Sequence, residues 1–307
     1  MRINLTTYRG GEGTPLVLVH GFPVDHRMWD TTAAALIAAT ADDPFPILAP
    51  DMPGAGDGPL PQPGEAGLIA DDTALPQAQD LMAESIVDAV RAAGYPKAVW
   101  AGLSMGGYAV LAIQRTRPEA VAGIALLDTK TSGDSDAARA RRCAIAHTCE
   151  TERTVDPVMF FTEPQDGDSP LKHSDWYVRL FTQWIRSQSP DGIAWRERMA
   201  AGRPDQHEAL ALIDTPAAVV CGTLDPSSPP AVMEPIAAQI KGAKLTVVEG
   251  SGHFTAVEQP AVVASALYDL MRRVRGAEAH PDAGEGAGTG ADDVEGASGG
   301  AAGEARA

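Results

Sequence analysis

Cysteine is scarce in this chain, which has 307 residues and only three cysteines, Cys143, Cys149 and Cys221. An odd set without the paired spacing of zinc ligands indicates neither a disulfide framework nor a cysteine-based metal site. Nothing in the chain implies a metal or an organic cofactor, and we expect neither. The same scarcity predicts a reduced, cytoplasmic environment.

Long apolar runs are also missing. The amino-terminal segment, residues 1–7, lacks the apolar stretch of a signal peptide, and no segment approaches the ~20 apolar residues that span a bilayer. We expect a soluble, unsecreted protein with no membrane contact.

Positive charge is in short supply as well. Lys and Arg number 24 against 41 Asp and Glu, a formal charge of −17, which argues against a nucleic-acid partner. Residues 276–307 hold seven of the acids and one Arg, with nine Gly, ten Ala and no aromatic residue. Such a segment has nothing to bury, so we predict a disordered, acidic, Gly/Ala-rich tail.

The chain does contain one informative pentapeptide, Gly102-Leu103-Ser104-Met105-Gly106. The apolar run at 97–101 predicts a buried strand before it, and the apolar spacing from Met105 onward predicts a helix after it. A strand, a sharp turn and a helix form a nucleophile elbow, which exposes a serine hydroxyl. Ser104 is therefore the predicted nucleophile, and the N–H of Met105 at the helix start is a predicted oxyanion donor.

A serine nucleophile requires a histidine base and an acid that orients it, in the chain order Ser, Asp, His. Asp225 follows the strand-like run 216–222, and His253 follows the strand-like run 243–249. Both would lie at carboxyl ends of strands, where ligand sites form in open α/β sheets. Asp128, just past another apolar run, remains an alternative acid, and Asp225 could merely cap the following helix.

The loop after an early strand should supply a second oxyanion donor. The most strand-like run near the amino terminus, 15–20, ends in His20-Gly21-Phe22-Pro23. The N–H of Phe22 is the expected donor.

These motifs together make the chain resemble the α/β-hydrolase superfamily over roughly residues 1–275, and more narrowly its capped esterases and lactonases. Further motifs of the resemblance are Asp25-His26-Arg27-Met28-Trp29, Asp51-Met52-Pro53-Gly54, Gly222-Thr223-Leu224-Asp225 and Gly252-His253-Phe254. The resemblance implies an α/β-hydrolase fold with a mostly parallel central sheet flanked by helices. It also implies that Ser104, Asp225 and His253 form a triad and that Phe22 and Met105 donate to the oxyanion. Asp128-Thr129-Lys130 and the helix after it are similar to enol-lactone hydrolases.

The predicted organisation is a catalytic core, residues 1–129 and 214–275, interrupted by a helical cap, residues 130–213. The cap contains helix-like runs at 134–150, 175–188 and 191–201 and seven of the sixteen aromatic residues. Some of these should line an apolar pocket above Ser104. The predicted substrate-binding residues are Phe22, Met105, Phe254, Trp176 and Phe181, and the Pro/Gly-rich loop at 53–76 is expected near the mouth of the pocket.

The predicted function is a serine carboxylesterase acting on small acyl or aryl esters. One alternative is a 3-oxoadipate enol-lactonase-like enzyme, which would need a carboxylate-binding arginine in the cap. Candidates for that arginine are Arg139, Arg141, Arg142, Arg179 and Arg186. A second alternative is a cofactor-free haloperoxidase or perhydrolase.

Overall fold

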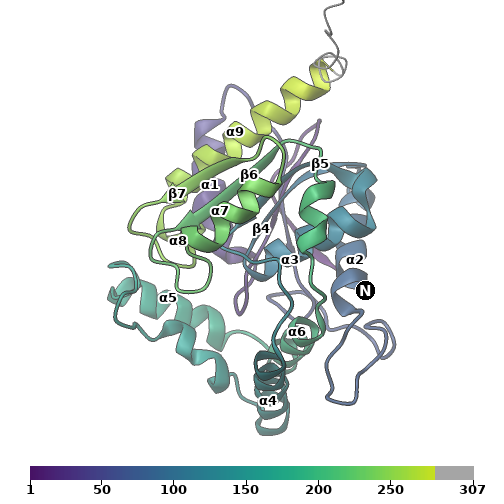
Figure 1. Cartoon of the computed structure of the whole chain (residues 1–307), viewed down its shortest axis with the longest axis vertical. Coiled ribbons are helices and arrows are strands. Elements are labelled where there is room, and N and C mark those ends of the chain that lie inside the picture. Colours follow the sequence, from purple (N-terminus) through teal and green to yellow (C-terminus); the bar gives the residue numbers. More distant parts are fainter. Residues whose placement is uncertain (281–307) are drawn as a thin grey trace, which may run out of the picture.

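A single seven-stranded sheet forms the centre of the molecule (Figure 1). The computed structural model describes residues 1–280; most of the predicted tail, residues 281–307, lies outside the described residues. The strand order is β1-β3-β2-β4-β5-β6-β7, with β1 antiparallel to β3 and all other neighbours parallel. The strands are β1 (Asn4–Arg9), β2 (Leu16–Val19), β3 (Ile47–Asp51), β4 (Ala98–Leu103), β5 (Val121–Leu127), β6 (Ala217–Gly222) and β7 (Lys244–Val248). The predicted mostly parallel sheet flanked by helices is confirmed.

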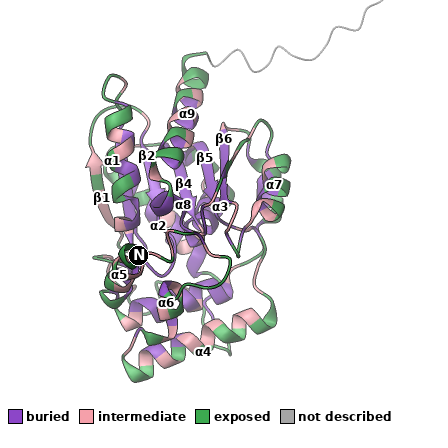
Figure 2. Ribbon diagram, turned by 90° about the vertical axis from the view of Figure 1, so that its left-hand side faces the viewer, coloured by how far each residue is buried: buried purple, intermediate pink, exposed green. Residues whose placement is uncertain are grey.

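Helices cover both faces of this sheet. On one face α1 (Asp30–Ala39) packs against α9 (Pro260–Ala279), and on the other α2 (Ala78–Ala92) packs against α3 (Met105–Thr116). The remaining core elements are α7 (Pro230–Gln239), α8 (Thr255–Glu258), η1 (His26–Trp29) and η2 (Pro118–Ala120). With helices on both sides, the central strands are buried throughout (Figure 2).

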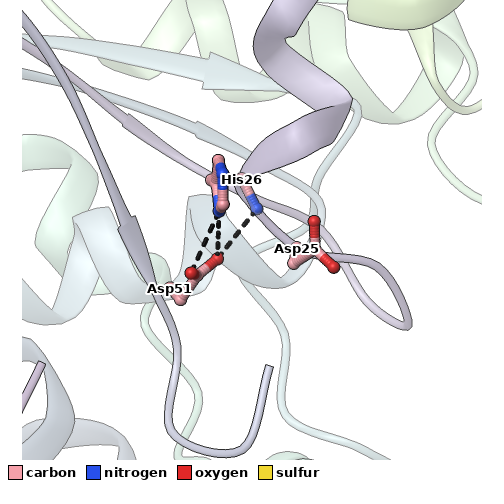
Figure 3. Close-up of side chains that lie close together, drawn as sticks. All are labelled: Asp25, His26 and Asp51. Atoms are coloured by element: carbon pink, nitrogen blue, oxygen red, sulfur yellow. Dashed lines mark hydrogen bonds and ion pairs between the residues drawn. The ribbon is translucent and has the colours of Figure 1, made fainter. Parts of the chain in front are cut away.

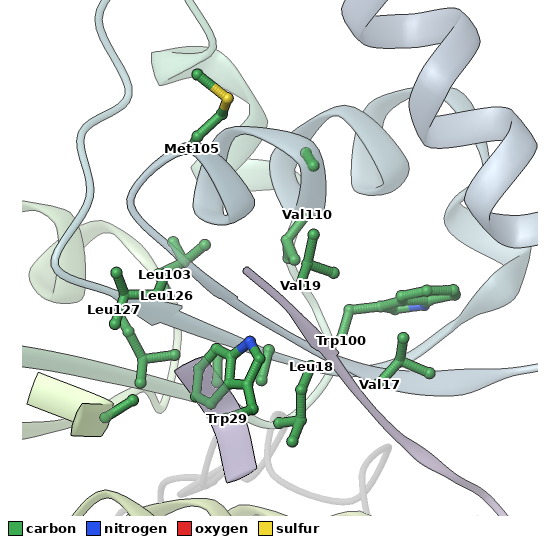
Figure 4. Close-up of a cluster of buried hydrophobic side chains, with 14 of the residues drawn as sticks. Val17, Leu18, Val19, Trp29, Trp100, Leu103, Met105, Val110, Leu126 and Leu127 are labelled. Carbon is green, nitrogen blue, oxygen red and sulfur yellow. The ribbon is translucent and has the colours of Figure 1, made fainter. Parts of the chain in front are cut away.

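Burial on both faces explains why the central strands have continuous apolar sequences. Every residue of β2 and β4 is buried. Figure 4 shows Val17 of β2 beside Trp100 of β4 and Leu18 of β2 beside Trp29 of η1. Parallel strands covered on both faces need apolar side chains at every position rather than at alternate ones.

A helical insertion, residues 130–213, separates β5 from β6. It contains α4 (Asp136–Glu152), η3 (Asp156–Thr162), α5 (Asp175–Arg186), α6 (Pro190–Gly202) and η4 (His207–Leu212). The three α-helices start at serines, Ser135, Ser174 and Ser189, whose hydroxyls accept from backbone N–H groups in the first turn. In Figure 1 these helices lie together at one end of the molecule, opposite the far end of α9.

The predicted boundary of the tail, at residue 276, lies too early in the chain. Helix α9 continues to Ala279, so residues 276–279 are helical, and Thr14 Oγ1 donates to Glu278 Oε1 at 2.6 Å. A single glycine costs a helix only ~1 kcal/mol, and Gly276 therefore does not end it. Within residues 1–280, no helix is both long enough and apolar enough to cross a bilayer.

Candidate active site

Ser104 lies on a sharp turn between β4 and α3. Its backbone φ is +54° and its ψ is −113°, a region that non-glycine residues rarely occupy. The flanking glycines are required by close packing: a Cβ on Gly102 would lie 2.2 Å from the Gly106 carbonyl oxygen, and one on Gly106 would lie 2.1 Å from the Val19 carbonyl oxygen. This is the backbone geometry predicted for a nucleophile elbow.

His253 connects Ser104 to Asp225. Its Nε2 lies 2.9 Å from Ser104 Oγ, and its Nδ1 lies 2.9 Å from Asp225 Oδ2. His253 stands in the loop between β7 and α8, while Asp225 follows β6, so three separate strand ends supply the three side chains. With Nδ1–H donating to the carboxylate, Nε2 is free to accept the hydroxyl proton of Ser104.

The surroundings of this relay favour a charged Asp225 and a basic His253. Burial opposes the charged form of His253, but the Asp225 carboxylate outweighs it and raises the pKa of His253 above 6.5. Burial likewise opposes ionisation of Asp225, yet the charge and hydrogen bond of His253 lower the pKa of Asp225 below 3.8. The Asp225 side chain is fully buried, and that of His253 is 17% exposed. A proton can therefore be exchanged at His253 while its acid stays shielded from water.

Asp128, the alternative acid, does not contact His253. Its fully buried carboxyl group accepts from Gly222 N at 3.1 Å, from Thr255 N at 3.2 Å and from Thr255 Oγ1 at 2.5 Å. Burial raises the pKa of Asp128 well above 3.8. The geometry thus favours Asp225 as the orienting acid. Asp128 instead connects the end of β6 to the start of α8 through these hydrogen bonds.

A second carboxylate holds the His253 loop and has no counterpart in the sequence prediction. Glu258 accepts from Gly252 N at 2.7 Å and from Phe254 N at 3.3 Å, on either side of His253. The only signal in the sequence is an acid five residues after the histidine, which is too common a spacing to stand out.

Two backbone N–H groups point to an oxyanion site. In the described part of the chain, the N–H groups of Phe22 and Met105 donate to no acceptor. The two segments are close neighbours, because Gly21 packs against Leu103 and the start of α3 packs against the end of β2. The predicted donors thus line the same cavity as Ser104, and the helix N-terminus favours negative charge there.

His20 braces the loop that carries Phe22. Its Nε2 accepts from Met52 N at 2.9 Å, and its Nδ1 lies 2.9 Å from the Gly21 carbonyl oxygen. Burial lowers the pKa of His20 to about 4, so the ring is neutral near pH 7. A neutral ring can accept at one nitrogen and donate at the other, as both contacts require.

Close to this loop, Asp25, His26 and Asp51 form a cluster of potential metal ligands (Figure 3). Each carboxylate oxygen already accepts a hydrogen bond. Arg27 and Gln188 donate to Asp25, while His26 and Asn4 donate to Asp51. These hydrogen bonds give the cluster a structural role, because they connect the loop to β3.

A cavity of about 890 Å³ opens above Ser104. Phe22, Met105 and Phe254, the three residues predicted for its floor, line the cavity together with polar side chains of the core, among them Thr223, Ser227 and Ser228. The helical insertion adds both aromatic and charged residues, among them Phe160, Phe161, Tyr177, Asp134, Arg141, Arg142, Glu197 and Arg203. The wall that the insertion was predicted to provide is therefore not mostly apolar, since charged residues line it beside the aromatic ones.

Two predicted pocket residues lie elsewhere. Trp176 is 46% exposed and does not line the cavity. Phe181 is fully buried behind the floor, stacked on Tyr177 at a centroid distance of 4.1 Å and edge-on to Phe254 at 4.8 Å. Neighbouring residues on a helix point about 100° apart, so Tyr177 faces the cavity where Trp176 does not. The loop at 53–76 also misses the cavity and lies against α6, where Leu75 N donates to the Arg198 carbonyl at 3.0 Å.

Most arginines of the insertion are paired with carboxylates. Arg139 pairs with Asp72, Arg142 with Asp134 and Glu197, Arg179 with Asp175 and Arg186 with Asp156. Arg141 differs: it lines the cavity, its guanidinium lies 5.4 Å from the centroid of the Phe160 ring, and it forms no ion pair within residues 1–280.

Known proteins similar to this chain are esterases and related hydrolases. A pimeloyl-[acyl-carrier protein] methyl ester esterase of Neisseria meningitidis is 26% identical over 263 residues, covering 84% of this chain and 93% of the relative. A thermophilic esterase from Thermogutta terrifontis superposes with a TM-score of 0.74 at 28% identity, covering 89% of this chain and 93% of its own. The enol-lactonase from Burkholderia xenovorans, 19% identical with a TM-score of 0.69 over 88% and 96% of the two chains, shares the fold.

The family is shown by a match that spans most of the chain. The family model described as "Alpha/beta hydrolase family" matches residues 16–266. That range includes every strand but β1, together with the helical insertion and all three residues of the hydrogen-bonded relay. This protein therefore belongs to the alpha/beta hydrolase family, and its relatives point to an enzyme that hydrolyses esters.

Proposed function

We propose that this protein is a serine carboxylic-ester hydrolase that acts on small acyl or aryl esters through an acyl-enzyme. The observation that carries the proposal is the continuous relay from Ser104 Oγ through His253 to Asp225, with both contacts at 2.9 Å. The relay opens into the cavity, where Phe22, Met105 and Phe254 offer apolar surface to an acyl chain or an aryl ring. The insertion acts as the cap over these residues.

In the first half of the reaction, His253 takes the proton of Ser104 as Oγ attacks the ester carbonyl. The carbonyl oxygen becomes an oxyanion and is stabilised by the N–H groups of Phe22 and Met105. His253 then gives its proton to the leaving alcohol. Asp225 stabilises the imidazolium that exists between these two steps.

In the second half, water replaces the alcohol. His253 accepts a proton from water as the water oxygen attacks the acyl carbonyl, and the same two N–H groups hold the new oxyanion. Return of the proton to Ser104 Oγ releases the carboxylic acid and restores the enzyme.

The decisive experiment is Ser104→Ala with p-nitrophenyl esters as substrates. We expect at least a ~10³-fold loss of kcat, no labelling by a fluorophosphonate probe and an unchanged melting temperature. Ser227→Ala is the matched control, because Ser227 lines the same cavity and bonds Asp225 only through its backbone N–H at 2.7 Å. Full turnover by Ser104→Ala would refute the proposal.

A second candidate, hydrolysis of a lactone that carries a carboxylate, is favoured by Arg141. Its unpaired guanidinium lines the cavity and could bind the anion. Arg141→Ala should then raise KM for a carboxylate-bearing lactone and leave KM for a neutral lactone unchanged. Arg179→Ala, outside the cavity, should change neither. Adding hydrogen peroxide and a carboxylic acid to the same panel tests the perhydrolase alternative.

A further inference from the structure

Arg196 of α6 is a buried charge without a carboxylate partner. Its side chain is fully buried, and within residues 1–280 it forms no ion pair. Its guanidinium instead donates to three uncharged acceptors: the Gly192 carbonyl at 3.1 Å, the Val24 carbonyl at 2.9 Å and Gln188 Oε1 at 3.0 Å. Because burial of an unpaired charge is costly, such an arrangement calls for an explanation beyond packing.

The contacts of Arg196 join the helical insertion to the loop that carries Phe22. We call residues 20–25 the oxyanion loop. On its core side, His20 accepts from Met52 and the Gly21 N–H donates to Met28 Sδ at 3.1 Å. On its insertion side, the Val24 carbonyl accepts from Arg196, whose guanidinium also lies 5.4 Å from the centroid of the Phe22 ring. Arg196 thus contacts the loop both at Phe22 and two residues beyond it.

A second route connects Arg196 to the end of the same loop. Gln188 accepts from Arg196 and donates through Nε2 to Asp25 Oδ2 at 2.6 Å. The buried Asp25 carboxylate in turn accepts from Nε and Nη2 of Arg27. Arg196 is therefore linked to the Asp25 carboxylate through the side-chain amide of Gln188. The two ends of this hydrogen-bonded chain contact the oxyanion loop at Val24 and at Asp25.

We propose that Arg196 is a positioning residue that sets the oxyanion hole from within the helical insertion. The proposal rests on the proposed function, because it concerns the N–H of Phe22 as an oxyanion donor. By fixing the Val24 carbonyl and the Phe22 ring, Arg196 fixes the peptide that carries this N–H. Donors aimed at a developing oxyanion stabilise the transition state far more than the bound ester, so a small shift of the loop lowers kcat and leaves substrate binding almost unchanged.

The test compares two inhibitors of similar shape. Ser104 Oγ adds to the carbonyl carbon of an aryl trifluoromethyl ketone while His253 takes the hydroxyl proton, and the resulting hemiketal oxyanion occupies the oxyanion hole. The corresponding trifluoromethyl carbinol fills the same space and cannot form that oxyanion. The inhibition constant of the carbinol divided by that of the ketone reports on how well the hemiketal oxyanion is stabilised, whereas general damage to the cavity weakens both inhibitors.

We expect Arg196→Met to lower this ratio at least ~10-fold and to lower kcat by a similar factor, with KM and carbinol affinity unchanged. Arg196→Lys, which keeps one donor for the Val24 carbonyl, should recover part of the ratio. Arg198→Met is the matched control, because Arg198 lies on the same helix and bonds Glu150 and Thr73 instead of the oxyanion loop. It should keep the ratio of the unmodified protein.

Gln188→Leu keeps the experiment decisive if Arg196→Met does not fold. It removes the link to Asp25 and leaves the bond to Val24, so an intermediate ratio is expected. An unchanged ratio in Arg196→Met, or in Gln188→Leu when only that variant folds, would overturn the positioning role. If the unmodified protein binds ketone and carbinol equally and turns over no ester, the proposed function itself has failed, a result distinct from the previous one.

Discussion

At the scale of single residues, the site depends on two buried aspartates with different surroundings. His253 holds the pKa of Asp225 below 3.8, whereas burial raises the pKa of Asp128 well above 3.8 despite the N–H and O–H groups that donate to it. Both aspartates follow strands of the sheet, so only the contacts that each one makes distinguish them. Asp225 contacts the histidine of the relay, and Asp128 bonds the backbone on either side of it.

The two aspartates should respond differently to the same change. We expect Asp225→Asn to lower kcat by ~10²–10⁴-fold, because the histidine loses its orienting acceptor and the stabiliser of its charge. Asp128→Asn should cost far less activity, and its main effect should be a lower melting temperature through imperfect pairing of the three donors around it. Steady-state kinetics and thermal unfolding of both variants would check the ranking; the reverse order would make Asp128 the orienting acid.

The activity should depend on pH through His253. The general base must be neutral, and Asp225 raises the pKa of His253 above 6.5. We therefore expect kcat/KM to rise with pH, with the midpoint of the acidic limb above 6.5. In Asp225→Asn the residual activity should have its midpoint at lower pH, because the main cause of the raised pKa is gone. A profile for the unmodified protein with its midpoint below 6 would contradict this reading of the relay.

At the scale of elements, the helical insertion is seated by close backbone contact as well as by ion pairs. Gly192 at the start of α6 touches Gly54 in the loop after β3, and a Cβ on Gly192 would lie 1.9 Å from the Gly54 carbonyl oxygen. This contact brings α6 near enough for Arg196 to reach Val24. The position of the helix and that of the oxyanion loop are therefore coupled.

Gly192→Ala should push α6 away from the core. We expect a loss of ~1–3 kcal/mol in the free energy of unfolding, as for other overpacked sites, together with faster proteolysis within the insertion. The matched control is Gly133→Ala, since a Cβ there has its nearest neighbour at 3.4 Å, an ordinary contact. Denaturant titration and limited proteolysis would measure both effects, and equal behaviour of the two variants would contradict the close-contact argument.

At the scale of the whole molecule, the large negative charge coexists with a few carboxylates that stabilise the fold. Asp25 is fully buried and joins η1, the oxyanion loop and the insertion through Arg27 and Gln188. Burial opposes its ionisation, but the charge and hydrogen bonds of Arg27 lower the pKa of Asp25 from 3.8 to about 2. Its charge therefore favours the folded state.

Acid should remove this contribution in a defined range. Because the pKa is depressed in the folded protein, the stabilisation of about 2 kcal/mol is complete above pH 3.8 and is lost as the pH falls toward 2. Asp25→Asn should flatten the fall in unfolding free energy between pH 5 and pH 2, as followed by urea titration. Asp71→Asn, at an exposed position with no ion pair within residues 1–280, should leave the fall unchanged. An equal slope in both variants would disprove the role of Asp25.

The sequence by itself determined the order of elements and the chemistry at the strand ends. Runs of apolar residues at 121–127 and 216–222 predicted strands because a sheet covered on both faces requires them, and the structure has them there. The glycines around Ser104 predicted the turn, since a Cβ at either would collide with backbone. These features depend on neighbours within a few residues, which a sequence displays directly.

Only the tertiary structure decided which distant side chains meet. Nothing local distinguishes Asp225 from Asp128, Tyr177 from Trp176, or the paired Arg142 from the unpaired Arg141. Arg196 and Val24 are separated by 172 residues, and their bond exists because α6 is seated on the loop after β3. Side-chain partners across such distances follow from the relative placement of whole elements, which is set by packing of the entire core rather than by any segment of the chain.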